Sequence, residues 1–427
     1  MKRNALLAFF FLQEKKTMRG FFSLSSVNLV QNVSLLIVLP YIARIITLEQ
    51  FGKIFFAQAV IQYFSLLIDY GFPFTMARDV ARVRNEQRTL NETVTNVFLI
   101  RIALAAICFV VLITICSTIE IFRQDAWLFY YTFGIVLGVA ISSEATLQGL
   151  EKMHVIFYAT LFARIGSLAT IFFFLHSHED YLVIPIAFSA QQIIASCIML
   201  IFLLWKMRVR FHPVRFTVFR STLQSQFRIF ISSAMLSVYS LNNTFFLRLF
   251  ASERVVGIYA AGEKVLKATL ALIGNLSQSF YPVIAVKTRE AKTEAIAMIR
   301  ILLRRFLLIG FVISTSLFIL ADLIVAWMYG SAFQEAGTVI RILSFIPFLL
   351  AGSSVFSNLY LLGFDYQRAW SRVIFSASAV GIVLLFALVA YLQWEYVGVS
   401  VAYLTSEAVI FILSGSIFWR KTHHADR

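Results

Sequence analysis

Seven basic residues lie within stretches of the chain that are otherwise apolar. They are Arg44, Arg101, Arg164, Arg248, Lys264, Lys267 and Arg341. The same stretches contain five acidic residues: Asp69, Glu144, Glu263, Asp322 and Glu407. A charge near the centre of a bilayer costs about 3 kcal/mol or more, so such residues usually face a watery cavity or a partner. The excess of cations predicts a cavity that binds an anionic cargo.

Depth along a helix separates these candidates. At a rise of about 1.5 Å per residue, Lys264 and Lys267 lie about 12 and 16 Å from the outer end of a span over 256–285. Glu263 precedes Lys267 by four residues, a spacing that favours an ion pair on one helix face. Lys267 therefore either pairs with Glu263 or contacts cargo. Lys264 has no such partner in its own helix and is the strongest candidate for binding cargo.

The arginines allow two interpretations each. Arg44, Arg248 and Arg341 lie nearer the outer ends of their spans, where they either snorkel to lipid headgroups or line the mouth of the cavity. Arg101 and Arg164 lie deeper, and either contact cargo or bridge neighbouring helices.

The acidic residues are candidates for gating or for coupling to an ion. Asp69 lies in "LLIDYGFPF", where it either pairs with Arg78 or Arg82 in a cytoplasmic gate or carries a coupling proton. Glu144, a candidate partner of the deep arginines, belongs to this group. The other members are Glu263 and Glu407. Asp322, close to the outer end of its span, is expected to face headgroups.

Composition identifies the elements that must position these residues. Of the 427 residues, 60% are hydrophobic and only 14% are charged, with a mean hydropathy of +0.82, whereas soluble domains are about a quarter charged. Apolar windows of about twenty residues recur and are too long for barrel strands. They predict an all-α integral membrane protein with twelve spans, at 21–45, 52–73, 93–115, 125–147, 155–175, 182–205, 228–250, 256–285, 305–327, 337–362, 370–392 and 396–419.

The positive charge is distributed asymmetrically over the connections. With the N-terminus in the cytoplasm, cytoplasmic segments hold 27 of the 37 lysines and arginines, and external loops hold three. Cytoplasmic loops of membrane proteins are enriched in these residues, so both termini are predicted to be cytoplasmic. The net charge of +15 then follows from topology and lipid contact, and we expect no nucleic acid partner.

The long middle connection divides the chain. We predict a cytoplasmic N-terminal segment (1–20), an N-lobe of six spans (21–205), a cytoplasmic linker (206–228), a C-lobe of six spans (229–419) and a cytoplasmic tail (420–427). A further basic loop, 74–92, is predicted to form a short surface helix.

The start of each lobe carries a similar stretch. "LPYIARIITLEQFGKIFFAQAV" (39–60) resembles "NTFFLRLFASERVVGIYAAGEKV" (243–265). The matched residues are Arg44 and Arg248, Glu49 and Glu253, and Gly52 and Gly257. Six spans separate the copies, so both have the same orientation. Halves related in this way pack about an axis along the membrane normal, with a cavity between them.

These motifs resemble a known family. "ARIITLEQFGKIFFAQAVIQYFSLLIDYGF", the basic loop after it and "GIYAAGEKVLKA" are similar to Wzx-type flippases of O-antigen and polysaccharide repeat units. That family belongs to the multidrug/oligosaccharidyl-lipid/polysaccharide exporters, which include the MATE transporters. The resemblance implies a MATE-like fold in the bacterial inner membrane. It also implies transport of an undecaprenyl-pyrophosphate-linked oligosaccharide from the cytoplasmic to the periplasmic leaflet by alternating access.

Other classes fit less well. A MATE-type drug antiporter usually carries cations, which would favour an acidic cavity. A polysaccharide polymerase or ligase would usually carry a large periplasmic loop, and every predicted external loop here is short. The sequence has no P-loop and no H-E-x-x-H, and Cys108, Cys116 and Cys197 form no C-x-x-C pair, so we expect neither an enzyme nor a cofactor or metal. Expected partners are the lipid-linked cargo, membrane lipids, and polymerase and chain-length proteins of the same pathway.

Overall fold

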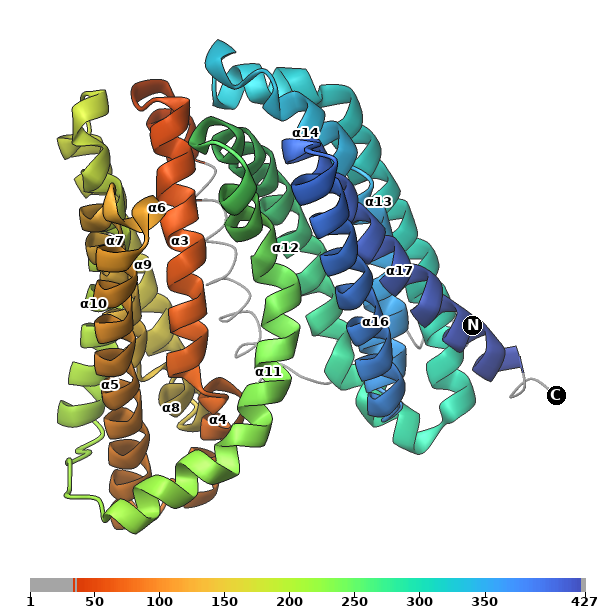
Figure 1. Cartoon of the computed structure of the whole chain (residues 1–427). Helices are drawn as coiled ribbons and strands as arrows, with labels where there is room; N and C mark the ends of the chain where they lie inside the picture. The colour runs from red at the N-terminus through yellow and green to blue at the C-terminus, as the bar shows by residue number, and fades with distance from the viewer. Residues whose placement is uncertain (1–33, 35–36, 424–427) are drawn as a thin grey trace.

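The computed structural model describes residue 34 and residues 37–423, apart from the side chains of 232–242 and 423. All regular elements in this part of the chain are helical (Figure 1). Residues 37–45 form the end of a helix, and the rest of the predicted span 21–45 lies outside the described residues, except for residue 34. The prediction of an all-α fold is confirmed.

The N-lobe continues after residue 47. Its helices are α3 (Leu48–Asp69), α4 (Phe72–Val83), α5 (Gln87–Thr118), α6 (Glu120–Arg123), α7 (Ala126–Ala140), α8 (Glu144–Gly149), α9 (Met153–Phe174), η1 (His178–Leu182) and α10 (Val183–Trp205). Between α3 and α4 the chain reverses at Gly71, whose φ of 81° suits a residue without Cβ. The short helix predicted in 74–92 is α4.

The C-lobe is also helical. Its helices are α11 (Phe216–Phe250), α12 (Glu253–Glu290), α13 (Lys292–Met328), η2 (Ser331–Phe333), α14 (Ala336–Leu343), α15 (Ile346–Ser353), the π-helix η3 (Ser354–Leu362), α16 (Gln367–Leu385), the π-helix η4 (Phe386–Tyr391) and α17 (Glu395–His423). The predicted linker is not helical over 206–215, but α11 begins at Phe216 and runs without a break through the predicted span 228–250.

Ten helical segments of the described chain are long and apolar enough to cross a membrane. They correspond to ten of the twelve predicted spans, so this is a multi-pass membrane protein. The remaining two predictions are 21–45 and the part of α11 at 228–250. The predicted span 125–147 is not one straight helix, because the chain breaks between α7 and α8 at residues 141–143.

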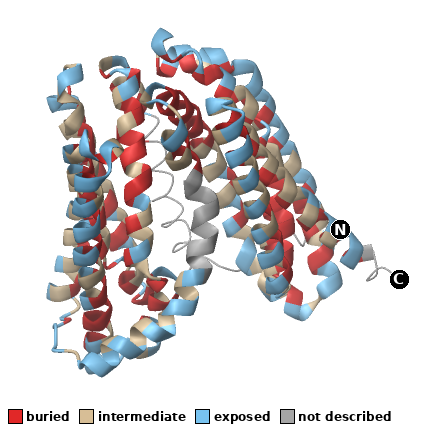
Figure 2. Ribbon diagram, in the orientation of Figure 1, coloured by how far each residue is buried: buried red, intermediate tan, exposed pale blue. Residues whose placement is uncertain are grey.

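The hydrophobic core shows how the lobes are joined. One cluster of buried side chains combines α3 with α12, and includes Phe51, Val256 and Tyr259. Two further clusters are separate: one lies in the N-lobe around Phe72, the other in the C-lobe around Phe418. The lobes thus share a core where α3 and α12 begin, which we call the joined end, and have separate cores at the opposite, split end (Figures 1 and 2).

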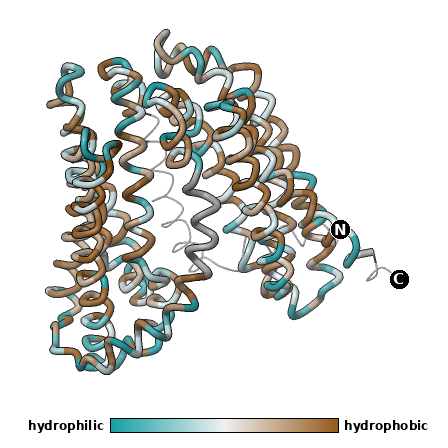
Figure 3. The backbone as a smooth tube through the Cα atoms, in the orientation of Figure 1, coloured by the Kyte–Doolittle hydropathy of each residue, from teal (hydrophilic) through white to brown (hydrophobic). Residues whose placement is uncertain are grey.

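The outer surface is apolar in the middle and aromatic at its ends. Brown, hydrophobic segments run along the long helices of both lobes (Figure 3), and large apolar side chains of these helices are exposed, among them Val110 and Ile319. The exposed tryptophans lie at helix ends: Trp127, Trp327 and Trp394 at the joined end, and Trp205 and Trp419 at the split end. Tryptophan is enriched at both membrane–water interfaces, so the two sets place the bilayer between the joined and split ends.

Helix α11 contacts both lobes. Near its start, Asn96 of α5 donates a hydrogen bond to the Thr222 hydroxyl at 2.6 Å, and the ring of Phe230 stacks on Tyr70 at 4.9 Å. Near its end, Phe246 packs against Phe386 of the C-lobe. The helix therefore links the two lobes along its length (Figure 1).

Candidate functional site

The two copies of the repeat form the contact between the lobes. Thr47 caps α3 by accepting a hydrogen bond from the backbone N–H of Gln50, and Ser252 caps α12 by accepting one from Val255. Hydroxyl side chains satisfy the free N–H groups at a helix start. Each cap precedes its repeat glycine by five residues, so both helices present Gly52 and Gly257 at the same height.

These glycines bring the two helix backbones together. A Cβ at Gly52 would lie 2.0 Å from the carbonyl oxygen of Glu253, and a Cβ at Gly257 would lie 2.3 Å from that of Leu48. Real side chains are not tolerated at such distances from backbone atoms, so neither position accepts alanine without a shift of a helix. Small residues let membrane helices approach this closely.

A charged network surrounds the glycine contact. The ammonium of Lys53 in α3 lies 2.9 Å from Asp125 and 3.7 Å from Glu253. Glu253 also accepts a hydrogen bond from the Arg248 guanidinium at 2.8 Å. The network therefore joins Asp125 and Lys53 of the N-lobe to Glu253 and Arg248 of the C-lobe. Because this network lies at the joined end, it can close that end of a path between the lobes.

Both repeat arginines reach the opposite lobe. Arg44 donates to the carbonyl oxygen of Trp327, near the C-terminus of α13, at 2.8 Å. The guanidinium of Arg248 lies 5.9 Å from the ring centre of Phe56 in α3. Arg44 is exposed, whereas the Arg248 side chain is only 17% exposed. The predicted placement of Arg44 and Arg248 between the lobes agrees with these contacts, while their role stays a prediction.

The middle of α12 carries the charges that the sequence singled out. Lys264 extends to the N-lobe, with its ammonium 4.2 Å from the ring centre of Phe55. Glu263 is buried, lies 3.1 Å from the Lys267 ammonium and accepts a hydrogen bond from Thr244. Lys267 thus pairs with Glu263, which is one of the two interpretations that the sequence allowed. Among the described residues, no carboxylate lies within ion-pair distance of Lys264.

A second ion pair lies at the split end of the N-lobe. The buried guanidinium of Arg101 lies 2.9 Å from Asp69 and donates to the carbonyl oxygen of Ser142 at 3.1 Å. Ser142 belongs to the break between α7 and α8. The prediction that Asp69 pairs with Arg78 or Arg82 was wrong, because α5 brings Arg101 to it from a distant part of the chain.

The remaining candidates lie inside single lobes. Glu144 accepts from Gln148 at 3.2 Å and makes no ion pair with Arg101. Arg164 bridges α9 to α10 by donating to Gln191 at 2.8 Å.

In the C-lobe, Arg341 forms an ion pair with Asp322 between α14 and α13, so Asp322 has a protein partner and is still exposed. Glu407 is buried in α17. The sequence analysis did not single out Lys53 or Asp125, which lie at the starts of the predicted spans 52–73 and 125–147. The signal that could have identified them was their position beside the repeat motif and before α7.

Comparisons with known proteins agree with this architecture. A family model described as "Polysaccharide biosynthesis protein" matches residues 17–286, more than half of the chain. A protein of Escherichia coli (strain K12) named "Putative O-antigen transporter" is 23% identical over 380 residues, which cover 88% of this chain and 90% of that protein. A protein of Shigella dysenteriae with the same name is 25% identical over 391 residues, which cover 88% and 94%.

Solved structures confirm the fold. An inward-facing conformation of a multidrug resistance MATE family transporter of the MOP superfamily has a TM-score of 0.73 at 13% identity, and the match covers 93% of this chain and 98% of that one. The lipid II flippase MurJ, in an inward closed conformation, has a TM-score of 0.63 at 12% identity, covering 89% and 86%. The repeat, the two lobes and the family match together establish that the chain belongs to the polysaccharide biosynthesis protein family and has a MATE-like fold.

Proposed function

We propose that the protein is a flippase for an undecaprenyl-pyrophosphate-linked oligosaccharide, an O-antigen or similar repeat unit. It would carry this lipid from the cytoplasmic to the periplasmic leaflet of the bacterial inner membrane by alternating access. The observation that carries the proposal is the arrangement of α3 and α12. They touch through Gly52 and Gly257 at one end, and α12 also carries Lys264, which contacts Phe55 of α3, and the partly exposed Lys267.

The chemistry of the cargo fits these side chains. A diphosphate needs cations that are free to leave their present contacts. Lys264 is held by the face of Phe55, and Lys267 is 42% exposed although it pairs with Glu263. A lysine ammonium binds phosphate as a point charge, so both can bind the diphosphate while the prenyl chain remains in lipid.

The joined end acts as the periplasmic gate in this proposal. The distribution of lysine and arginine predicts that Thr47 and Ser252 face the periplasm. The described state is then closed to the periplasm and resembles an inward-facing MATE transporter more than an outward-facing one, with TM-scores of 0.73 and 0.61. Transport requires the glycine contact and the network around Lys53 to separate.

The decisive experiment is complementation of a flippase-null bacterial strain that carries one of several O-unit pathways. We expect the chain to restore surface polysaccharide for at least one pathway, and Lys264→Ala to lower that restoration. Expression without surface polysaccharide in any pathway, together with resistance to cationic drugs, would instead identify a drug antiporter. Reporter fusions at Arg210 and after Arg427 test the topology, and an external signal at either would reverse the proposed gate.

A further inference from the structure

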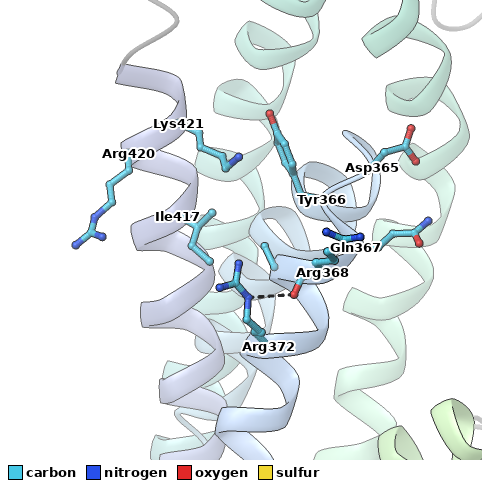
Figure 4. A pocket seen from close by; sticks show the side chains of 9 residues that line it. Asp365, Tyr366, Gln367, Arg368, Arg372, Ile417, Arg420 and Lys421 are labelled. Carbon is cyan, nitrogen blue, oxygen red and sulfur yellow. Dashed lines mark hydrogen bonds between the residues drawn. The ribbon is translucent and has the colours of Figure 1, made fainter.

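A hollow at the split end of the C-lobe lies away from the path between the lobes. It has a volume of about 550 Å³ and lies between the start of α16 and the last turns of α17 (Figure 4). Its lining residues are Asp365, Tyr366, Gln367, Arg368, Ala369, Arg372, Ile417, Arg420 and Lys421. Nothing in the proposed transport path uses this hollow.

The lining is strongly cationic. Arg368, Arg372, Arg420 and Lys421 are all exposed, and Asp365 is the one acidic residue among the lining residues. Within the described chain none of the four basic side chains forms an ion pair. Arg372 donates to the carbonyl oxygen of Arg368 at 3.3 Å, and the Lys421 ammonium lies 3.6 Å from the ring centre of Tyr366 (Figure 4).

The start of helix α16 adds to the positive electrostatic potential of the hollow. The hollow includes the N-terminus of the 19-residue helix α16, which has no side-chain cap. A helix N-terminus offers free N–H groups and a partial positive charge to an anion. Arginine can hold phosphate oxygens with two parallel donors. The chemistry of the hollow is therefore that of a phosphate site.

The exposed face of α16 shows which phosphate compound fits. Arg368, Arg372, Phe375, Ala379 and Val383 are exposed and follow one another at helical spacing. The stripe is cationic at the split end and apolar further along the helix. Such a stripe matches the headgroup and acyl chains of a lipid, and an inorganic ion would use only its cationic part.

The depth in the membrane agrees with that assignment. Trp419 directly precedes Arg420 and is 54% exposed, and Trp205 is exposed at the same end. Since exposed tryptophans mark the headgroup region, the hollow lies at the level of lipid phosphates.

We propose that the hollow between α16 and α17 binds the phosphate headgroup of an anionic phospholipid, with an acyl chain along Phe375 and Val383. Basic pockets between membrane helices bind such headgroups through charge and hydrogen bonds. The bound lipid would connect the two helices at the split end, where Lys421 and Tyr366 already meet across them.

The test measures lipid binding to the purified full chain by native mass spectrometry, with phosphatidylglycerol and phosphatidylcholine as probes. We expect phosphatidylglycerol to be retained more strongly. Arg368→Gln combined with Arg372→Gln should weaken that binding about 25-fold, from about fivefold for each cation removed. Arg368→Lys with Arg372→Lys should keep much of it.

The matched control is Arg210→Gln with Arg215→Gln, which removes two exposed arginines at the same end but outside the hollow. It should leave phosphatidylglycerol binding unchanged. Phe375→Ser should weaken phosphatidylglycerol binding and leave the binding of inorganic phosphate unchanged. Lys421→Gln provides an independent single substitution if the double variant fails to fold. Equal retention by pocket and control variants would overturn the proposal, and so would displacement of the lipid by millimolar inorganic phosphate with no effect of Phe375→Ser.

Discussion

Helices α3 and α12 are copies of one repeat, yet only one carries charge in its middle. Both begin with a hydroxyl cap and both place a glycine against the other lobe. From that glycine onward they diverge. Glu263, Lys264 and Lys267 of α12 correspond, by distance from the glycine, to Gln58, Ala59 and Gln62 of α3.

This difference separates packing from chemistry. The caps and glycines recur because two backbones must approach within contact distance, and that geometry needs the same small residues on each side. Cargo contact has no such requirement, since one lobe can supply the charge while the other supplies Phe55. In the N-lobe, the buried Arg101 lies outside α3, where it pairs with the partly exposed Asp69 at the end of that helix.

The largest effect is expected from breaking the pair of Arg101 and Asp69 in the N-lobe. Asp69→Asn leaves the buried guanidinium of Arg101, which is 7% exposed, without its ion-pair partner and should lower the free energy of unfolding by about 3–5 kcal/mol. Thermal denaturation of the purified protein measures this. Arg78→Gln is the control, because its pair with Asp79 is exposed, and such pairs contribute about 1 kcal/mol or less. Lost export at unchanged stability would instead assign this ion pair to transport.

Alanine at either glycine of the contact between α3 and α12 should have the same effect on the separation of the lobes. Gly52→Ala forces a methyl group against the Glu253 carbonyl and should disfavour the joined state by about 1–3 kcal/mol. Gly257→Ala should do the same. Spin labels at Glu49 and Ser331, in a background without the native cysteines, would report a longer distance between the lobes.

Gly274→Ala in α12 is the control for this pair, because no atom lies within 4 Å of its added Cβ. An unchanged distance in Gly52→Ala and Gly257→Ala would show that the glycines do not set the separation of the lobes.

Lys264 tests whether the C-lobe alone supplies the charge. Lys264→Ala should lower export about tenfold or more, since contacts to a charged group contribute about 1.5–3 kcal/mol, and Lys264→Arg should retain more activity. Gln62→Ala, at the N-lobe position that corresponds to Lys267, should have little effect. Surface polysaccharide at matched protein level is the measurement. An equal and mild loss of export in Lys264→Ala and Lys264→Arg would indicate a structural or lipid-facing role for this lysine.

The smallest effects are expected from the two repeat arginines, and they should be unequal. Arg248→Gln removes the partner of the partly buried Glu253. Arg44→Gln removes one exposed hydrogen bond to the Trp327 carbonyl, which contributes about 1 kcal/mol. Export should fall more for Arg248→Gln, and lysine should restore part of it at each position. Full activity of both Gln variants would leave the arginines with no role at the gate.

The positions of the spans could be predicted because helices in lipid must be long and apolar. The ion pairs formed by charged residues inside the spans were harder to predict from the sequence. Lys267 and Glu263 are four residues apart on one helix, so their pairing follows from helical spacing. Asp69 and Arg101 are 32 residues apart on different helices, and only the packing of α3 against α5 brings them together.

The acidic residues of the repeat also have contacts that the sequence match alone did not predict. Glu49 and Glu253 match in the sequence, but Glu253 lies one residue after its cap and Glu49 two residues after Thr47. A shift of one residue turns a side chain by about 100° on a helix. Glu253 consequently joins the network with Lys53, whereas Glu49 is exposed.

The sequence by itself determined that the chain is a helical membrane protein with a repeat, because periodicity, apolar length and basic loops are properties of the chain alone. Only the tertiary structure decided that the repeat glycines meet, that Lys264 contacts Phe55 and that Arg101 pairs with Asp69. Each of these contacts joins different helices. Their existence depends on the angle and height at which the helices pack, which no local pattern specifies.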